Sequence, residues 1–253
     1  MKTAIVIPAR LASTRLPGKP LLAQTGKPLL VHVLENAARI RGNDTLLVAT
    51  DDNRILQAAR AAGFEGMMTS PQHASGTDRL AEVAQRVTAD VFINLQGDEP
   101  TVDIAAVEAL IAAMHDDPRR RMGTLVTALA DEAAYRNPNV VKAVCDASMR
   151  ALYFSRAPIP HCRDGFSMEK LRAARVFKHL GVYAYRRDLL AEFTAWPRGG
   201  LEQIEQLEQL RALEHGVAIH AVVSARDSIG IDTPADYAAF LAAWQTKTTA
   251  GSR

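Results

Sequence analysis

The stretch TAIVIPARLASTRLPGKP, residues 3–20, contains the pattern that decides the fold. It begins with a short apolar run, residues 4–7, which predicts a buried strand that Pro8 ends. A long polar loop follows, and Pro28 then takes the first position of a helix predicted to reach about Arg39. A buried strand, a loop and a helix form the repeating unit of an α/β fold.

The same unit recurs through the first half of the chain. Apolar runs at 45–50, 64–69 and 91–95 predict three more strands, and helical patterns at 53–62 and 76–87 separate them. Continuously apolar strands are typical of a parallel sheet covered by helices on both faces. We therefore expect an α/β domain with three layers and a mostly parallel central sheet.

The pattern changes after about residue 120. Apolar or β-branched runs at 125–130, 140–144, 151–154 and 180–185 have little helix between them, which predicts antiparallel strands in a subdomain or in an extension of the main sheet. The polar, basic stretch 158–175 predicts a mobile loop. The remaining patterns indicate an amphipathic helix at 201–213, a strand at 217–223, a closing helix at 237–244 and a frayed tail at 246–253.

The composition excludes several classes of protein. With 48% apolar residues, the 253-residue chain has enough apolar surface to offset the entropy cost of folding, so it is not intrinsically disordered. Its two cysteines, Cys145 and Cys162, exclude a disulfide-stapled scaffold, and their spacing does not fit a zinc site. The 30 basic and 28 acidic side chains are too balanced for general nucleic-acid binding.

The location can be predicted from two further features. No apolar run approaches the roughly 20 residues that a membrane helix needs. The N-terminus runs directly into a strand and leaves no room for a signal peptide. We therefore expect a soluble, cytoplasmic protein without nucleic-acid or membrane partners.

Three cations lie in the loop after the first strand, namely Arg10, Arg15 and Lys19. Ligands of open parallel sheets bind beyond the carboxyl ends of the strands, where this loop is expected. Small residues and Gly18 allow backbone N–H groups to approach a ligand, so the loop suits a polyanion such as a phosphate chain. Neither a Walker P-loop nor a Gly-x-Gly-x-x-Gly pattern is present. A solvated basic loop is the alternative.

Two aspartates are candidate Mg²⁺ ligands. Asp98 follows the strand at 91–95 and comes directly after Gly97, which lets a ligand approach closely. Asp232 precedes the last predicted helix. The alternative for each is a structural role as the N-cap of the helix that follows it.

The segment HASGTDR, residues 73–79, offers hydroxyls and free N–H groups at a predicted helix start. An anion or the edge of a base could bind there, and a capping box is the other interpretation. Glu202, Glu205 and Glu208 share a broad face of the predicted helix at 201–213, which is either solvated or turned toward a polar ligand.

Eight segments, taken together, resemble the 3-deoxy-manno-octulosonate (Kdo) cytidylyltransferases, or CMP-Kdo synthetases. They are IPARLASTRLPGKPL (7–21), ATDD (49–52), HASGTDRL (73–80), NLQGDEP (94–100), YFSRAPIP (153–160), HLGVYAY (179–185), LEQLR (207–211) and GIDTP (230–234). The resemblance implies one nucleotidyltransferase domain over 1–253 with the nucleotide-diphospho-sugar-transferase fold. It also implies that about 121–200 is an inserted, smaller antiparallel subdomain for dimerisation and sugar binding.

The resemblance further implies a reaction and its participants. CTP and Kdo give CMP-Kdo and pyrophosphate for lipopolysaccharide biosynthesis, with Mg²⁺ as cofactor and a homodimer as the assembly. The nearest alternative is a relative that uses a sialic acid or an amino-Kdo. The second is a nucleotide-binding protein that has lost its activity.

Residue roles follow from the same resemblance. Arg10, Lys19 and Asp98 are the expected catalytic residues, and Asp98 and Asp232 the metal ligands. CTP is assigned to Ala9, Arg10, Arg15, Lys19, Ser75, Gly76, Arg79 and Gln96. The sugar is assigned to Gln96, Arg156, His179, Tyr183, Glu208 and Gln209.

Overall fold

The computed structural model describes residues 1–13, 15–228 and 230–250, the last four by their backbone alone. Within these residues one sheet has the order β3-β2-β1-β4-β8-β5-β9, and β6 and β7 extend it beside β8. The strands are β1 (Thr3–Ala9), β2 (Thr45–Thr50), β3 (Glu65–Met68), β4 (Val91–Asn94), β5 (Met122–Ala128), β6 (Lys142–Cys145), β7 (Ala151–Ser155), β8 (Val176–Arg186) and β9 (Ile219–Val223).

The helices connect the strands in the first half as the sequence predicts. The first of them are the 3₁₀ turn η1 (Lys19–Leu21), α1 (Leu29–Ala37), α2 (Asn53–Ala61), α3 (Gly76–Arg86) and α4 (Ile104–Asp116). Later in the chain come α5 (Glu132–Arg136), α6 (Met168–Ala173), α7 (Arg187–Ala195), α8 (Gly200–Glu205), α9 (Leu210–Glu214) and α10 (Pro234–Ala250).

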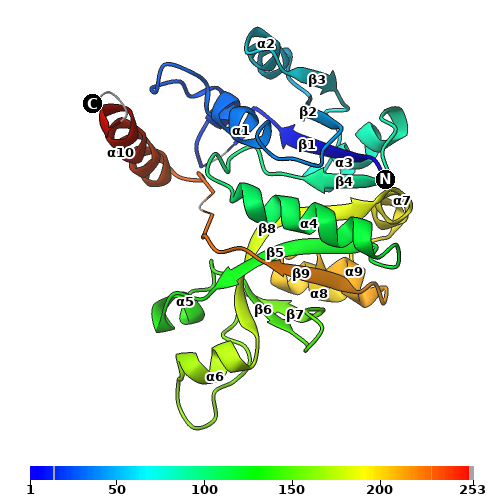
Figure 1. The fold of residues 1–253 in the computed structure, drawn as a ribbon, viewed down its shortest axis with the longest axis vertical. Helices are drawn as coiled ribbons and strands as arrows, with labels where there is room; N and C mark the ends of the chain where they lie inside the picture. The colour runs from blue at the N-terminus through cyan, green and yellow to red at the C-terminus, as the bar shows by residue number, and fades with distance from the viewer. Residues whose placement is uncertain (14, 229, 251–253) are drawn as a thin grey trace.

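The sheet is parallel on one side and mixed on the other. β1 runs parallel to β2 and β4, and β2 runs parallel to β3. β8 enters in the opposite direction between β4 and β5, and also pairs antiparallel with β6. The strands after residue 120 therefore extend the main sheet, and the β6–β7 hairpin projects from it near α5 and α6 (Figure 1).

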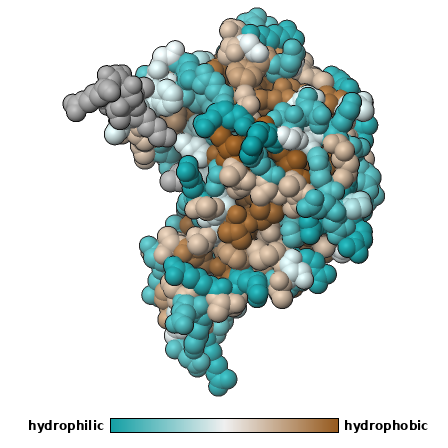
Figure 2. Space-filling view, in the orientation of Figure 1, coloured by the Kyte–Doolittle hydropathy of each residue, from teal (hydrophilic) through white to brown (hydrophobic). Residues whose placement is uncertain are grey.

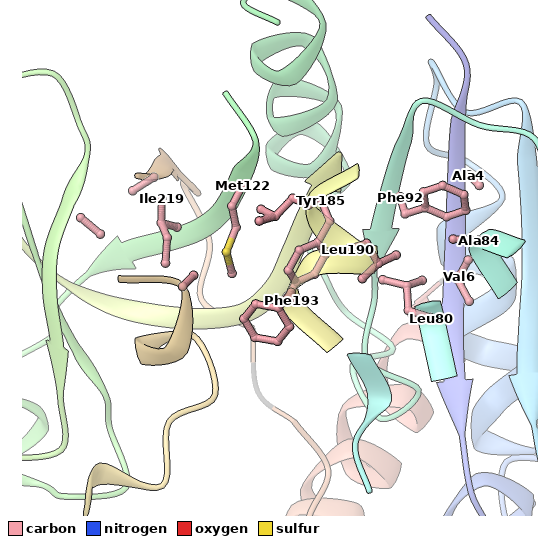
Figure 3. Close-up of a cluster of buried hydrophobic side chains, with 14 of the residues drawn as sticks. Ala4, Val6, Leu80, Ala84, Phe92, Met122, Tyr185, Leu190, Phe193 and Ile219 are labelled. Atoms are coloured by element: carbon pink, nitrogen blue, oxygen red, sulfur yellow. The ribbon is translucent and has the colours of Figure 1, made fainter. Parts of the chain in front are cut away.

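Two apolar cores sandwich the sheet and give the expected three layers. On one face, Ile5 and Ile7 of β1 pack with α1, α2 and α4. On the other face, Ala4 and Val6 of the same strand pack with α3 and α7. Figure 3 shows this second core, where Leu80 lies beside Val6, and Tyr185 of β8 lies between Met122 and Leu190. Alternate residues of one buried strand thus serve opposite layers.

Short polar side chains begin several helices at the carboxyl edge of the sheet. Asp52 accepts a hydrogen bond from Arg54 N at the start of α2, and Asp103 accepts one from Ala105 N at the start of α4. Ser75 and Asp78 form a capping box at the start of α3. These caps satisfy the free N–H groups of each first turn and set where each helix begins.

The structure corrects several predicted elements. The prediction of a single helix at 201–213 is wrong. Gln206 adopts a left-handed conformation with φ of 53°, and the segment therefore forms two helices, α8 and α9. No predicted range corresponds to helix α4, which lies between the predicted strands at 91–95 and 125–130, or to helix α7. The stretch 158–175 contains α6, and the predicted frayed tail is helical to residue 250, while 251–253 lie outside the described residues.

The surface is mixed in character. The face in Figure 2 carries hydrophobic patches between hydrophilic side chains. Among the described residues, no helix combines the length and the apolar character needed to cross a bilayer.

Candidate active site

A cavity of about 600 Å³ lies at the carboxyl ends of β1 and β4. Its walls come from segments that the sequence analysis singled out: the loop after β1, the residues before and at the start of α3, the turn after β4, and Asp232. The described residues that line it are Pro8, Ala9, Arg10, Ala12, Ser13, Arg15, Lys19, Pro20, His73, Ala74, Ser75, Gly76, Arg79, Gln96, Gly97, Asp98 and Asp232. The structure therefore brings together all the residues assigned to CTP, to metal and to catalysis.

Lys19 joins the two aspartates across the floor of the cavity. Its ammonium lies 2.5 Å from Asp98 Oδ2 and 3.0 Å from Asp232 Oδ1. Arg15 donates to the other oxygen of Asp232 at 3.0 Å. Burial alone would lower the pKa of Lys19, but the charges and hydrogen bonds of Asp98 and then Asp232 outweigh it and raise the pKa above its usual value. Lys19 is therefore a fixed cation.

Neither aspartate acts as a helix cap, which was the alternative for both. Helix α4 is capped by Asp103. At the start of α10, Asp236 N donates to Thr233 Oγ1 at 3.2 Å, and Thr233 N donates to the Asp236 carboxylate at 2.8 Å. The carboxylates of Asp98 and Asp232 are thus left to the cavity.

The carboxylates of Asp98 and Asp232, which both contact the Lys19 ammonium, are suitable ligands for a hard divalent cation. Mg²⁺ bound beside phosphates takes one or two protein carboxylates and completes its shell with water and phosphate oxygens. The described residues contain no group of three or more acidic, histidine or cysteine side chains placed to hold a metal. Any cation held by Asp98 and Asp232 would therefore draw its remaining ligands from substrate and water.

Two glycines let three backbone segments meet beside these carboxylates. A Cβ on Gly97 would lie 3.0 Å from the carbonyl oxygen of Pro8, and one on Gly76 would lie 3.2 Å from the Pro8 ring. Both distances are shorter than ordinary packing allows. The turn after β4 and the start of α3 can approach the end of β1 because these positions carry no side chain.

The 73–79 segment has two interpretations, a ligand-binding site or a capping box, and the start of α3 has features of both. Ser75 caps the helix with Asp78, and Ser75 and Gly76 also line the cavity. Arg79 lines the same wall, yet its guanidinium is buried and donates to Asp51 at 2.9 Å and to Thr69 at 2.5 Å. Asp51 is a residue that reasoning from spacing missed, although its place after β2 was a signal.

Most of the residues assigned to the sugar are not among the described lining residues of the cavity. Of the six, Gln96 is the one found among the described lining residues, and its amide donates to the Gly181 carbonyl of β8 at 3.1 Å. His179 and Tyr183 follow on β8, with ring centroids 5.3 Å apart. Burial lowers the pKa of His179 to about 3 and raises that of Tyr183 well above its usual value, so both rings are neutral near pH 7.

Glu208 connects the α8–α9 segment to the start of α3, and Gln209 follows it in the chain. Glu208 accepts a hydrogen bond from the Thr77 hydroxyl, and burial raises the pKa of its carboxyl. Gln209 is buried, and its amide nitrogen has no hydrogen-bond partner among the described residues. A polar and aromatic region thus adjoins the cavity from Gln96 and Thr77 to Tyr183.

Arg156 belongs to a different network. Its guanidinium donates to the carbonyls of Glu205, Pro138 and Gln206 at 2.8, 3.2 and 3.4 Å, and its backbone N–H donates to the Glu205 carboxylate. The glutamate face predicted at 201–213 is accordingly neither solvated nor uniform. Glu202 is buried against Arg211, Glu205 holds the backbone of Arg156, and Glu208 contacts Thr77.

Comparison with known proteins identifies the family of this chain. The family model for cytidylyltransferases matches residues 4–219. A 3-deoxy-manno-octulosonate cytidylyltransferase of Geobacter sulfurreducens is 48% identical over 93% of this chain and 96% of its own length. One from Escherichia coli is 49% identical over 92% of each.

The chain belongs to the cytidylyltransferase family. A solved structure of CMP:2-keto-3-deoxy-manno-octonic acid synthetase complexed with CTP is 45% identical and superposes with a TM-score of 0.91, covering 98% of this chain and all of the other. The resemblance, the α/β nucleotidyltransferase fold with its mostly parallel central sheet, and the assignment to the nucleotidyltransferases are thereby confirmed. A 4-diphosphocytidyl-2C-methyl-D-erythritol synthase from Anaerococcus prevotii, 13% identical with a TM-score of 0.63, shares the fold alone.

Proposed function

We propose that this enzyme transfers CMP from CTP to Kdo, releases pyrophosphate, and works in the cytoplasm in lipopolysaccharide biosynthesis. The observation that carries the proposal is the convergence of Lys19, Asp98 and Asp232 in a cavity walled by the basic loop after β1. The names of the relatives, which cover nearly the whole chain, support the choice of Kdo.

The nucleotide half of the site follows from charge and access. Arg10, Arg15 and Lys19 supply positive charge along one wall, which suits the triphosphate. Ser75 and Gly76 at the start of α3, together with Gln96, offer polar groups for the cytidine. Arg79 shapes this wall through its bonds to Asp51 and Thr69.

Mg²⁺ is the cofactor we propose, held by Asp98 and Asp232. The two carboxylates already share one cation, the Lys19 ammonium, so their separation suits a cation placed between them. A bound Mg²⁺ would supply Lewis-acid neutralisation of the phosphate oxygens.

In this reaction the residues of the chain position Kdo and CTP and stabilise the negative charge of the reacting groups. The anomeric hydroxyl of Kdo gives up its proton to water and attacks the α-phosphorus, the bond from that phosphorus to the bridging oxygen breaks, and pyrophosphate leaves on the opposite side. Because both reactants are anions, Arg10 and Lys19 offset their repulsion and the charge that develops on the leaving group. A protein nucleophile is not required.

We also propose that residues of about 121–200 form the part of the domain used for dimerisation and sugar binding. Leu152 on β7 is 61% exposed, and Ile204 on helix α8, just after this range, is 81% exposed. The Ser155 hydroxyl of β7 donates a hydrogen bond to Glu205 of α8, which places the two elements side by side. Large apolar side chains that are exposed to this degree are typical of protein–protein contacts when they cluster. The molar mass in solution tests the dimer.

The experiment that tests the function measures pyrophosphate release from CTP and Mg²⁺ with Kdo, with amino-Kdo, with N-acetylneuraminate and without sugar. Release that requires Kdo supports the proposal. Release with another sugar acid alone would assign the enzyme to a sibling reaction. CTP binding without release for any sugar would favour a protein that has kept the fold and lost the activity.

Arg156→Ala tests the sugar half of the site. The guanidinium holds the backbone at 138 and at 205–206, so its loss is expected to disturb the sugar side and raise the KM for Kdo by about tenfold or more, with little change in the KM for CTP. Arg150→Ala, on the turn of the same hairpin and paired with Asp146 at the surface, is the matched control and should leave both constants unchanged. Equal effects of Arg156→Ala on the two KM values would remove Arg156 from the sugar site.

A further inference from the structure

The topology sets a problem for Asp232. It follows β9, which lies at one edge of the sheet, whereas Asp98 and Lys19 follow β4 and β1 near the centre. The connection from β9 to α10 must therefore cross the carboxyl end of β5 and the amino-terminal part of β8 before Asp232 reaches the cavity. Figure 1 shows in orange the described residues that leave β9 and those that lead into α10.

Backbone and side-chain contacts along the crossing attach it first to β5, then to β8 and then to the turn after β4. Ser224 N donates to Val126 O of β5 at 2.7 Å, and its hydroxyl lies 3.2 Å from Asp103. Asp227 then pairs with Lys178 of β8 at 2.7 Å. The last attachments reach the turn after β4: Ser228 Oγ donates to Glu99 Oε2 at 2.8 Å, and Ile231 N donates to the Asp98 carbonyl at 2.9 Å.

The Glu99–Ser228 bond differs from the others in its burial and position. Both residues are only 7% exposed. Glu99 is the immediate neighbour of Asp98, so this bond ties the crossing to the same turn that presents the first carboxylate. The nearby Lys178 is paired with Asp227. Among the described residues, the side chain that donates a hydrogen bond to the Glu99 carboxylate is Ser228. Breaking the bond would leave a buried carboxylate with one fewer donor and would free the segment just before Asp232.

We infer that Glu99 and Ser228 are positioning residues, whose buried hydrogen bond holds Asp232 against Asp98 and Lys19. Neither is among the described lining residues of the cavity: Glu99 belongs to the turn that carries Asp98, and Ser228 lies four residues before Asp232 in the chain. The inference rests on the proposed function in one respect, namely that Asp98 and Asp232 share a divalent cation. Partners that orient metal-binding side chains in this way typically contribute about 10- to 100-fold to metal affinity.

The test measures Mn²⁺ binding to the full-length protein by electron paramagnetic resonance, with CTP present and no sugar. Ser228→Ala is expected to weaken Mn²⁺ binding by about 10-fold or more, while Ser228→Thr, which keeps the hydroxyl, restores it to near the wild-type value. Glu99→Gln, which keeps an acceptor of the same shape, is expected to have a smaller effect than Ser228→Ala and serves as the second variant if Ser228→Ala does not fold.

Thr3→Val is the matched control. It removes a buried hydroxyl that bonds to His115 at 2.8 Å, at the opposite end of β1 from the cavity. It should lower the melting temperature as Ser228→Ala does, without changing Mn²⁺ affinity.

The outcomes separate this inference from the proposed function. Mn²⁺ affinity of Ser228→Ala within about twofold of the wild type would assign the bond a purely structural role and overturn the inference. Absence of Mn²⁺ binding by the wild type would overturn it as well. A wild type that binds Mn²⁺ but has no activity with Kdo would contradict the proposed function, and weaker Mn²⁺ binding by Ser228→Ala would still support the inference.

Discussion

Asp98→Asn is expected to lower kcat by about 10³-fold or more and to leave CTP affinity nearly unchanged. The substitution keeps the size of the side chain and removes one of the two carboxylate charges that meet at Lys19. A cation held there is expected to contribute several kcal/mol to the stabilisation of transition-state charge, and about 4 kcal/mol corresponds to 10³ in rate. CTP still meets Arg10, Arg15 and the start of α3, so binding should survive.

The measurement compares single-turnover rates and CTP dissociation constants at a fixed, moderate Mg²⁺ concentration. Asp52→Asn is the control, because Asp52 also follows a strand but caps α2 and pairs with Arg54 outside the cavity lining. Normal turnover of Asp98→Asn at that Mg²⁺ concentration would contradict the metal assignment.

Lys19→Ala is expected to lower kcat by about 10²–10³-fold, the usual effect of removing one electrostatic stabiliser. Lys19 is held by both aspartates and is 13% exposed, so its charge is placed before substrate arrives. Its loss also leaves Asp98 and Asp232 facing each other without the shared ammonium. Rates measured at saturating CTP and Kdo test the prediction.

Two further variants make the Lys19 result specific. Lys27→Ala removes a lysine of the same loop region that pairs with Glu35 and is not among the described cavity residues, and it should have little effect. Lys19→Arg keeps the charge but changes the number and direction of the donors, so an intermediate rate is expected. A loss of less than about threefold in Lys19→Ala would mean that Lys19 does not stabilise the reacting charges.

The nucleotide side of the site could be predicted from the sequence because it depends on local order. Arg10, Lys19 and Asp98 each follow a parallel strand closely, and the carboxyl ends of parallel strands meet at one edge. The predicted strands and helices of the first half also match the observed bounds to within one or two residues at most ends, because these elements depend on local sequence patterns.

Long-range geometry could not be predicted in this way. Periodicity does not reveal that β8 enters between β4 and β5 against their direction, which pairs Tyr183 with Asn94 of β4 and His179 with Val126 of β5. The left-handed Gln206 overrides an unbroken helical pattern, and its consequence is that Glu205 and Glu208 serve different networks. Asp232 reaches Asp98 by a crossing from the edge of the sheet, which is attached by separate hydrogen bonds and by the ion pair between Lys178 and Asp227.

The measurement that tests the central claim most directly follows the α-phosphorus of CTP. The enzyme is incubated with CTP labelled with ³²P at that position, Mg²⁺ and Kdo, and the label is traced among sugar nucleotide, pyrophosphate and protein. Attack by the sugar hydroxyl on the α-phosphorus predicts all transferred label in CMP-Kdo, unlabelled pyrophosphate in equal amount, and none on the protein. Label in pyrophosphate, on the protein, or released as CMP without Kdo would contradict the account.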